Sequence, residues 1–451
     1  MKAKKHKSLS SKMTIALVTA IIIAAAAFIG RFYFFVKVND KLYSIYTQSF
    51  TFTDSDKIKD YSVFNRFKSL KSLDFSSTDF TQADYDYIAS QVKSDVKILW
   101  NVPVGNDLVP SDTESITITD KTAVVDCSFY KYFTDLKEVN VSSMEVSPQL
   151  QSIIEGAREC FPDIKINCKT SVYGVEFSSD TEMLDLNAID ITDLSDLDLT
   201  ISLFPNLKSV EICSCRLDNE VIAALNDKYP DTKVVWLLKI ERYSIRTDVQ
   251  VFSTLSPTAK KLIFDKTALP IFKYCTDLRA LDIGHNGISD LRPLTNLKKL
   301  HTLILADNYL TDISPLTELK ELNYVEFQVN QIKDISPLSE LPLMSDVKID
   351  RNDGLKNITS LTKCKNLKKL FCSQCRVSNA EIAELKQNLP EDCMLRYTKK
   401  YSDISYWRTD EKNANIREAF ANWQNVKEFP DWQTIVYWDR DVYDFSSNHT
   451  A

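Results

Sequence analysis

Glycine is scarce in this sequence, with seven among 451 residues, and histidine is scarcer still, with four. Loops that cradle phosphates need glycines at set spacings, and neither a Walker A motif nor a complete G-x-G-x-x-G is present. G-x-S-x-G and H-E-x-x-H are absent too. His285 and His301 have no recognisable catalytic partner. We interpret them as residues that lie at a strand end and in a turn, without a catalytic role. The sequence therefore predicts no enzyme, no cofactor and no metal site.

Net positive charge is confined to the N-terminus. Residues 1–41 hold eight Lys or Arg against the single acid Asp40, a balance of +7, so the rest must carry −14 to give the total of −7. An acidic body repels the phosphates of a nucleic-acid backbone. Nucleic acid is therefore excluded as a partner.

An uncharged run from Met13 to Gly30 follows five lysines. As a helix it reaches about 27 Å, close to the hydrocarbon thickness of a bilayer, and the basic flank favours the cytoplasm. We predict a cytoplasmic tail at 1–12, a single-pass signal-anchor at 13–36 in the cell membrane, a linker at 37–60 and an extracytoplasmic body. The small residues Ala24 to Ala27 leave a cleaved signal peptide as the alternative, which would make the protein secreted.

The strongest signal is a repeat of 22 residues. Blocks start at Leu278, Leu300 and Leu322, and a fourth starts at Met344 with one inserted residue near Gly354. They follow L-x-x-L-x-L-x-x-N-x-L, the leucine-rich-repeat pattern, and their length and D-I-S-P-L turns resemble the internalin-type class. One coil cannot bury its leucines alone, whereas several stacked coils can. The expected fold is an α/β leucine-rich-repeat solenoid with a parallel concave sheet and short helices or turns on the convex side.

Polar residues recur at one phase of each repeat, where the chain leaves the strand. An asparagine there can bond the backbone of the turn and stack as a ladder between neighbouring coils. Cysteine is a known substitute at this position. The expected ladder is Asn286, Asn308, Asn330, Asn352, Cys375 and Cys215.

Four longer units surround the regular blocks, starting at Leu70, Leu136, Leu207 and Leu367. Each reads as a strand, a turn, a helix of about twelve residues and a second strand, with cap chemistry at the helix start. We assign 61–245 to irregular longer repeats and 246–397 to the leucine-rich-repeat array proper.

Ten cysteines in an exported chain suggest disulfides. Cys372 and Cys375 form a C-x-x-C, but both fall at inward repeat positions, so we interpret them as structural. Cys213 lies at an outward phase and is the better candidate for thiol chemistry. Two pairings stay open: Cys160 with Cys168, and Cys364 with Cys393.

The tail at 398–451 is rich in aromatic residues, among them Trp407, Trp423, Trp432 and Trp438. A repeat array exposes its last hydrophobic face and needs a cap. We therefore expect an aromatic cap, with a carbohydrate-binding platform as the alternative.

Outward-facing strand residues tile the concave surface of such an array, and strand parity identifies them. Exposed Ile304, Tyr324 and Phe371 among charges have the anchor-and-rim composition of a protein-binding patch. We predict protein binding or adhesion at this face, with an unidentified protein as ligand. The candidate residues are Asp282, Ile304, Tyr324, Glu326, Gln328, Asp346, Lys348, Asp350 and Phe371.

Over most of residues 170–425, the chain resembles anchored or secreted leucine-rich-repeat proteins of gram-positive gut bacteria. The matching stretches are the basic signal-anchor, RTDVQVFSTL, CTDLRALDIGHNGISDL and the aromatic tail. The resemblance implies no enzyme activity and no established ligand. Two other functions stay open: a structural role in the cell envelope, and glycan binding by the C-terminal tryptophans.

Overall fold

The computed structural model describes residues 11–53, 58, 60–122, 124, 126–240, 243–254, 268–398, 407 and 411–421. The chain forms two compact units. Unit 1 comprises Met1–Glu182 with Leu194–Leu207, and unit 2 comprises Met183–Asp193 with Lys208–Ala451.

Helix α1, Ser11–Phe34, contains the uncharged N-terminal run. In the part of the chain that the structure describes, no helix has the length and apolarity needed to cross a bilayer. The stretch expected as a linker at 37–60 instead contains most of a hairpin, β1 Phe35–Val38 and β2 Lys41–Ser44, and strand β3, Ser49–Thr53. Phe50 and Phe52 are buried at alternate positions of β3, as a half-buried strand requires. These strands of four or five residues are too short to stand out in the sequence.

Unit 1 contains two mainly parallel sheets. In the first, β3 pairs with β4 and β4 with β5, all in parallel. In the second, β8, β9 and β10 are parallel and β11 folds back on β10. The strands are β4 Ser72–Ser77, β5 Lys97–Leu99, β6 Asn101–Val104, β7 Asp107–Pro110, β8 Ser115–Thr119, β9 Glu138–Glu145, β10 Lys165–Val172 and β11 Val175–Ser178. The helices are α2 Gln82–Gln91, α3 Pro148–Cys160 and α4 Ser195–Leu203, with 3-10 turns η1 Tyr61–Arg66, η2 Asp120–Thr122 and η3 Ser128–Tyr132.

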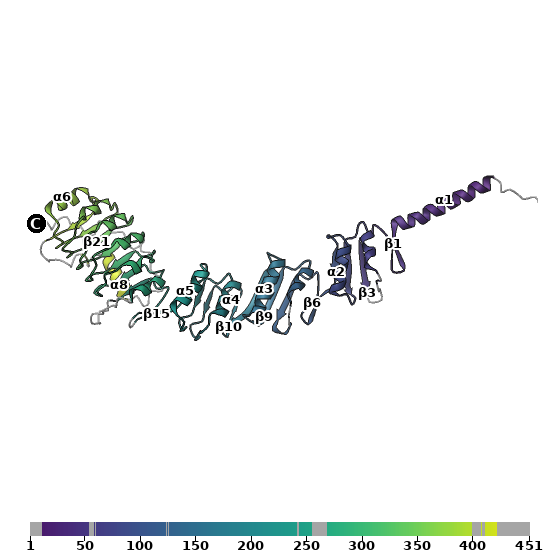
Figure 1. Cartoon of the computed structure of the whole chain (residues 1–451), viewed down its shortest axis with the longest axis horizontal. Coiled ribbons are helices and arrows are strands. Elements are labelled where there is room, and N and C mark those ends of the chain that lie inside the picture. Colours follow the sequence, from purple (N-terminus) through teal and green to yellow (C-terminus); the bar gives the residue numbers. More distant parts are fainter. Residues whose placement is uncertain are drawn as a thin grey trace, which may run out of the picture. The chain divides into compact units, whose positions relative to one another are not determined.

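Unit 2 begins with a three-stranded parallel sheet and a hairpin, and continues as a seven-stranded parallel sheet. The first elements are β12 Met183–Asp185, β13 Ser209–Glu211, α5 Asn219–Lys228, β14 Lys233–Val235, β15 Leu237–Ile240 and β16 Tyr243–Arg246. The large sheet comprises β17 Val251–Ser253, β18 Ala280–Asp282, β19 Thr302–Ile304, β20 Tyr324–Glu326, β21 Asp346–Lys348, β22 Lys369–Phe371 and β23 Met394–Arg396. Between these strands run η4 Leu269–Tyr274, η5 Arg292–Leu294, η6 Ser314–Glu318, η7 Ser336–Glu340, η8 Ile358–Lys363 and α6 Asn379–Asn388, and α8 Glu411–Ala421 follows them (Figure 1).

The register of the large sheet follows the repeat. Ala280, Thr302, Tyr324 and Asp346 pair in sequence, and each occupies the same position of its block. Asp346 then pairs with Lys369, one position later than the repeat length alone would place it. This shift matches the single inserted residue expected near Gly354. The repeat leucines are fully buried behind the strands. The expectation of a parallel leucine-rich-repeat solenoid is confirmed.

A larger repeat organises the chain: each strand–helix–strand unit follows a hairpin and one further strand. The hairpins start pairing at Phe35, Asn101, Lys169 and Leu237, at nearly equal intervals along the chain. The same backbone hydrogen bond spans the open end of each hairpin. The N–H of the residue after the hairpin donates to the carbonyl of the residue before it. These bonds are Ile45 to Phe34 (3.0 Å), Ser111 to Trp100 (2.8 Å), Ser179 to Cys168 (2.8 Å) and Thr247 to Trp236 (3.0 Å). In the last of these groups, the coils that carry β18 to β21 lie between the further strand, β17, and the strand–helix–strand unit of β22, α6 and β23. Among the described residues, the other groups contain no such additional coils.

Buried asparagines connect successive coils. Asn330 is representative: its Oδ1 accepts from the N–H of Leu310 (3.0 Å), and its Nδ2 donates to the carbonyls of Leu305 (2.9 Å) and Phe327 (3.0 Å). Asn308 and Asn352 repeat this geometry one coil before and one coil after. Each amide therefore satisfies backbone groups that water cannot reach.

Replacing Asn330 with alanine should lower the free energy of unfolding by about 2 kcal/mol. The Leu305 and Phe327 carbonyls keep bonds from Asn308 and Asn352, so the cost arises mainly from the Leu310 N–H, which loses its acceptor. Chemical denaturation of the variant measures it. Gln331→Ala removes an exposed amide next to it and serves as the control. Equal effects of the two changes would contradict this account of the ladder.

A column of left-handed residues precedes the ladder position. His285, Asp307, Val329, Arg351 and Gln374 have φ between 54° and 62°. Asparagine and aspartate tolerate this conformation, whereas a β-branched side chain is strained in it. Val329 is therefore the least suited member of the column.

Val329→Asn should raise the free energy of unfolding by about 1 kcal/mol, because asparagine tolerates the left-handed region in which valine is strained. Thr311→Asn replaces another β-branched residue, exposed and without a positive φ, and should have little effect. Thermal unfolding of both variants distinguishes them. A loss of stability in Val329→Asn would contradict the assignment of strain.

Candidate protein-binding surface

The residues expected on the concave face form the predicted columns. Asp282, Ile304, Glu326, Lys348 and Phe371 pair in sequence across five strands. Tyr324 and Asp346 are neighbours in the next column, between Thr302 and Lys369. Their expected exposure is wrong, because only 1% of Tyr324, 3% of Phe371 and 8% of Ile304 is exposed.

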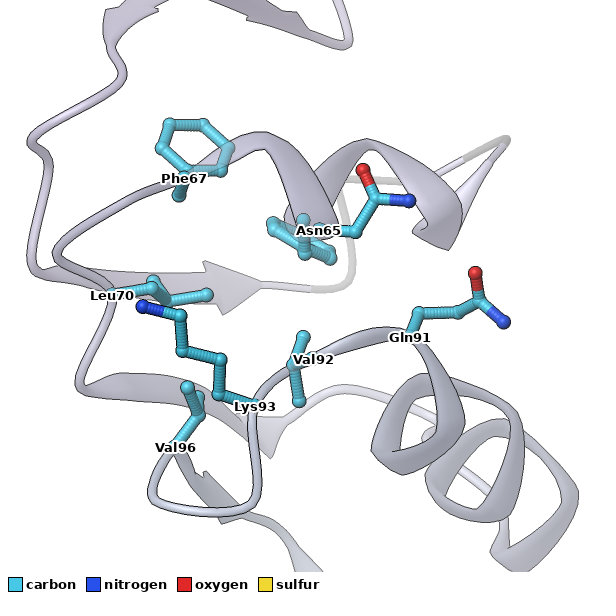
Figure 2. A pocket seen from close by; sticks show the side chains of 8 residues that line it. Asn65, Phe67, Leu70, Gln91, Val92, Lys93 and Val96 are labelled. Atoms are coloured by element: carbon cyan, nitrogen blue, oxygen red, sulfur yellow. The ribbon is translucent and has the colours of Figure 1, made fainter.

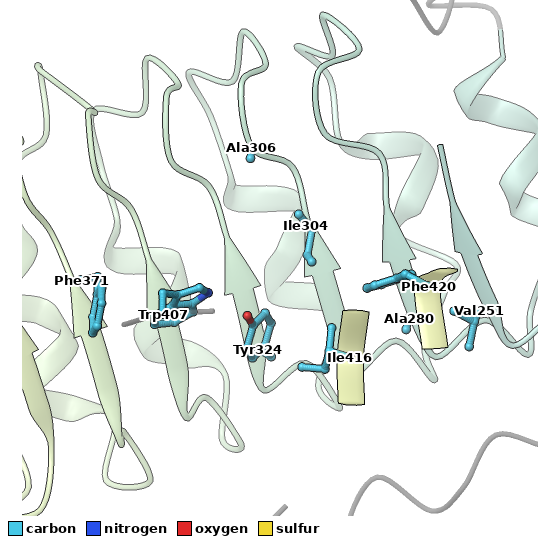
Figure 3. Close-up of a cluster of buried hydrophobic side chains, with 9 residues drawn as sticks. All are labelled: Val251, Ala280, Ile304, Ala306, Tyr324, Phe371, Trp407, Ile416 and Phe420. Carbon is cyan, nitrogen blue, oxygen red and sulfur yellow. The ribbon is translucent and has the colours of Figure 1, made fainter. Parts of the chain in front are cut away.

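The chain's own C-terminal segment covers this face. Trp407, Ile416 and Phe420 form one buried cluster with strand residues that include Tyr324 and Phe371. Figure 3 shows Ile416 and Phe420 beside the strand residues Ile304, Ala280 and Val251, and Trp407 between Tyr324 and Phe371. The described part of the tail thus lies along the concave face. Its aromatic composition had instead predicted a cap at the end of the array.

Trp407 is the main anchor of the segment. Its ring packs edge-on against Phe371 at 4.8 Å and tilted against Tyr324 at 5.5 Å between ring centroids. Its indole Nε1 donates to Glu326 Oε1 (2.9 Å), which also accepts from the Tyr324 hydroxyl (2.6 Å). A buried indole that keeps its polar contact is the arrangement found at strong binding positions.

Two ammonium groups also face the indole. Lys348 Nζ lies 5.4 Å and Lys369 Nζ 5.5 Å from the Trp407 ring centroid, within the range of cation–π attraction. Both side chains are almost fully buried. The tryptophan therefore covers charged residues as well as apolar ones.

Asp346 is the main polar contact for α8. Lys412 Nζ lies 2.6 Å from Asp346 Oδ2, and Lys369 Nζ lies 3.7 Å from Oδ1. Burial alone would raise the pKa of Asp346, but the two ammonium groups outweigh it and hold the pKa below its ordinary value. The carboxylate is therefore ionised at neutral pH, and it attracts the helix through Lys412.

Acidification should weaken the contact of α8 with the sheet. The folded-state pKa of Asp346 lies below the ordinary value of 3.8, so its contribution is complete above the unfolded value and is lost as pH falls through the folded one. We expect α8 to stay attached at pH 5 to 7 and to loosen below about pH 4. Hydrogen exchange of residues 411–421 along a pH series measures this. The Asp346→Asn variant is the control and should lack the transition assigned to this carboxyl.

Helix α8 presents one stripe to the sheet. Lys412, Ile416 and Phe420, at spacings of four residues, are buried, whereas Arg417 and Glu418 are exposed. This spacing places the three buried side chains on one helical face. The sequence contained the stripe, but nothing in it indicated which surface the stripe would cover.

The remaining candidates lie at the end of the strands. Gln328 is half-buried and donates through Nε2 to Glu326 Oε2 (3.1 Å). Asp350 accepts from the N–H of Ser373 (2.7 Å), and burial raises its pKa. Asp282 is buried and accepts from the N–H of Gly284 (3.2 Å). Gln328 and Asp350 are therefore the candidates that retain partial exposure.

No disulfide links the ten cysteines, all of which lie in the described residues. Burial raises the pKa of Cys375 to about 12, and its thiol donates to the carbonyl of Ile349 (3.1 Å), as Asn352 does. Cys372 is buried, and burial raises the pKa of its thiol well above the ordinary value. Cys215 is half-buried after β13, and burial raises the pKa of Cys213 to about 11. A raised pKa disfavours the reactive thiolate.

A small pocket lies elsewhere, in unit 1. It has a volume of about 200 Å³ and opens between η1 and the end of α2 (Figure 2). Phe67, Leu70, Val92 and Val96 line it, with Asn65 and Lys93 among its polar residues. Its lining contains no histidine, cysteine or carboxylate.

Comparison with known families identifies the repeats. Residues 276–318 and 298–340 each match the family described as "Leucine Rich repeats (2 copies)". Residues 276–340 therefore consist of leucine-rich repeats, and repeats of this kind indicate a protein–protein interaction module. No curated protein matches the chain.

Several solved structures share local similarity. An internalin C2 of Listeria monocytogenes is 19% identical over 51% of this chain and 88% of its own, with a TM-score of 0.28. An internalin (inlF) of the same organism is 17% identical over 81% and 91%, with a TM-score of 0.28. A leucine-rich-repeat protein of Leptospira interrogans is 13% identical over 77% and 88%, with a TM-score of 0.26. TM-scores this low support no further conclusion about this chain.

Proposed function

We propose that this protein is a non-catalytic binding or adhesion module that captures a protein through the concave face of β17–β23. The single observation that carries the proposal is that this face already holds a polypeptide. Trp407 and α8 pack on it through apolar, hydrogen-bonded and ionic contacts together. The strand side chains beneath Trp407 and α8, which we call the floor, include apolar Tyr324 and Phe371 and charged Glu326, Asp346, Lys348 and Lys369. An apolar centre with charges around it suits reversible protein recognition.

We propose further that the face is displayed outside the cytoplasm by a single N-terminal anchor. The support is in the sequence: a basic flank precedes the uncharged run at Met13–Gly30, which favours the cytoplasm for the tail. Alkaline carbonate extraction of the full chain tests this. An anchored chain stays with the membrane fraction and is degraded by protease added outside, whereas a cleaved one appears in the medium.

Site-specific photo-crosslinking tests the binding face. A benzophenone amino acid replaces Gln328 in the full chain, and a second variant carries it at the exposed Glu340 of η7. Each variant is irradiated with surface proteins of host and bacterial cells, and the adducts are identified by mass spectrometry. We expect one partner to be captured from position 328 and missed from position 340. Capture from position 340 alone, or adducts only within the chain, would contradict the proposal.

A further inference from the structure

We propose that the natural partner of the concave face is an amphipathic helix with an aromatic anchor and a basic residue. In this proposal, the Trp407–α8 segment is an internal ligand that competes for the same floor. The inference rests on the proposed function and specifies its partner class. The segment is defined as Trp407 with residues 411–421.

The composition of the floor is the first reason. Glu326, Asp346, Lys348 and Lys369 all lie beneath the segment, each exposed by 5% or less. A permanent interior would be filled more stably by apolar side chains, because buried charges seldom repay their desolvation. A floor with these charges stays soluble when uncovered. It therefore suits an occupant that leaves.

The kind of contact is the second reason. Each of the strands β18 to β22 is hydrogen-bonded to a neighbouring strand at both of its edges. A ligand on their face therefore cannot pair with them as a further strand. It must bind through side chains. A helix presents them as one stripe at spacings of three or four residues, which is how Lys412, Ile416 and Phe420 meet the sheet.

The length of the helix is the third reason. Helix α8 has eleven residues, and a helix this short is marginal in water without tertiary packing. Its stability must therefore come from the sheet, and it can exchange with a competitor. Because it is tethered to the same chain, it acts at an effective concentration in the millimolar range. An incoming helix must overcome that concentration.

A peptide added in trans tests the proposal. The probe is a fluorescein-labelled peptide of residues 405–422, and the receptor is the full chain with Trp407, Ile416 and Phe420 each changed to serine. We expect the peptide to bind this emptied chain about 100-fold more tightly than it binds the wild-type chain, because the tethered segment no longer competes. Fluorescence anisotropy measures both affinities.

Peptide variants test whether the contacts are those described. Trp407→Ala in the peptide should weaken binding by about 30-fold or more, as expected for a central aromatic anchor. Arg417→Ala, at an exposed position of α8, is the matched control and should have no effect. In a double-mutant cycle, Lys412→Gln in the peptide should weaken binding to the emptied chain but have little further effect once the receptor also carries Asp346→Asn.

A second measurement needs no emptied chain. Unlabelled peptide at saturation should speed hydrogen exchange of α8 in the wild-type protein, which shows displacement directly. The proposal is overturned if the peptide does not bind, if Trp407→Ala and Arg417→Ala peptides bind equally, or if exchange in α8 stays unchanged. A peptide that binds and displaces α8, while no partner is captured by photo-crosslinking, would overturn the proposed function and the partner class that rests on it, and would leave only the competition by the Trp407–α8 segment. A captured partner with no displaceable α8 would overturn only this inference.

Discussion

Replacing Trp407 with alanine is expected to release helix α8 from the sheet. The indole is 1% exposed, and truncating a buried tryptophan typically costs about 3 to 5 kcal/mol. The Glu326 carboxylate would also lose the bond from the indole Nε1, while retaining that from Tyr324. A helix of eleven residues cannot bear such a loss, because it has little stability of its own.

The effect of Trp407→Ala should be local. The leucines that connect the coils lie on the other side of the sheet and stay buried, so strands β18 to β21 should keep their protection. Hydrogen exchange is the measurement: residues 411–421 should exchange like an unfolded peptide while the strand amides stay slow. Arg417→Ala, at an exposed position of the same helix, should change neither. Protection of α8 that survives Trp407→Ala would show that the indole is not its anchor.

Asp346→Ala is expected to destabilise the protein by about 3 to 5 kcal/mol, the usual cost of removing one partner of a buried ion pair. The carboxylate is 1% exposed and faces Lys412 at 2.6 Å and Lys369 at 3.7 Å. Its removal leaves two ammonium groups close together in a buried setting without this counter-charge. Part of the cost is relieved when α8 detaches and Lys412 returns to water, so the loss should appear first in α8.

Asp353→Ala is the matched control for Asp346→Ala. Asp353 pairs with Arg376 at 3.8 Å, but both side chains are more than two-thirds exposed, and surface pairs contribute at most about 1 kcal/mol. Denaturant unfolding with α8 exchange as a second readout compares the two variants. Similar losses would mean that burial gives Asp346 no special role.

The repeat pattern predicted the sheet in detail because each coil is determined locally. Leucine spacing predicted the strand register, including the inserted residue before Lys369, and the recurring asparagines occupy one equivalent position per coil. The hairpins were missed because strands of four residues resemble loops in a sequence, and because their recurrence is clear only from pairing at Phe35, Asn101, Lys169 and Leu237.

Parity also predicted which side chains point to the concave side, but not that they are covered. The residues that cover them come after the last strand of the sheet, and no local pattern links Trp407 to Glu326. Their contact is set by tertiary packing between positions that are far apart in the sequence. The three other tryptophans of the expected aromatic cap, Trp423, Trp432 and Trp438, lie outside the described residues.

The length of helix α8 matches the width of the part of the sheet that it covers. From Lys412 to Phe420 it rises about 12 Å, and the three strand spacings from Asp346 on β21 to Ala280 on β18 span about 14 Å. Deleting one whole coil would leave the register of the remaining strands intact, but Lys412 and Phe420 could no longer both reach their contacts. The number of coils is thereby tied to the length of a helix that belongs to none of them.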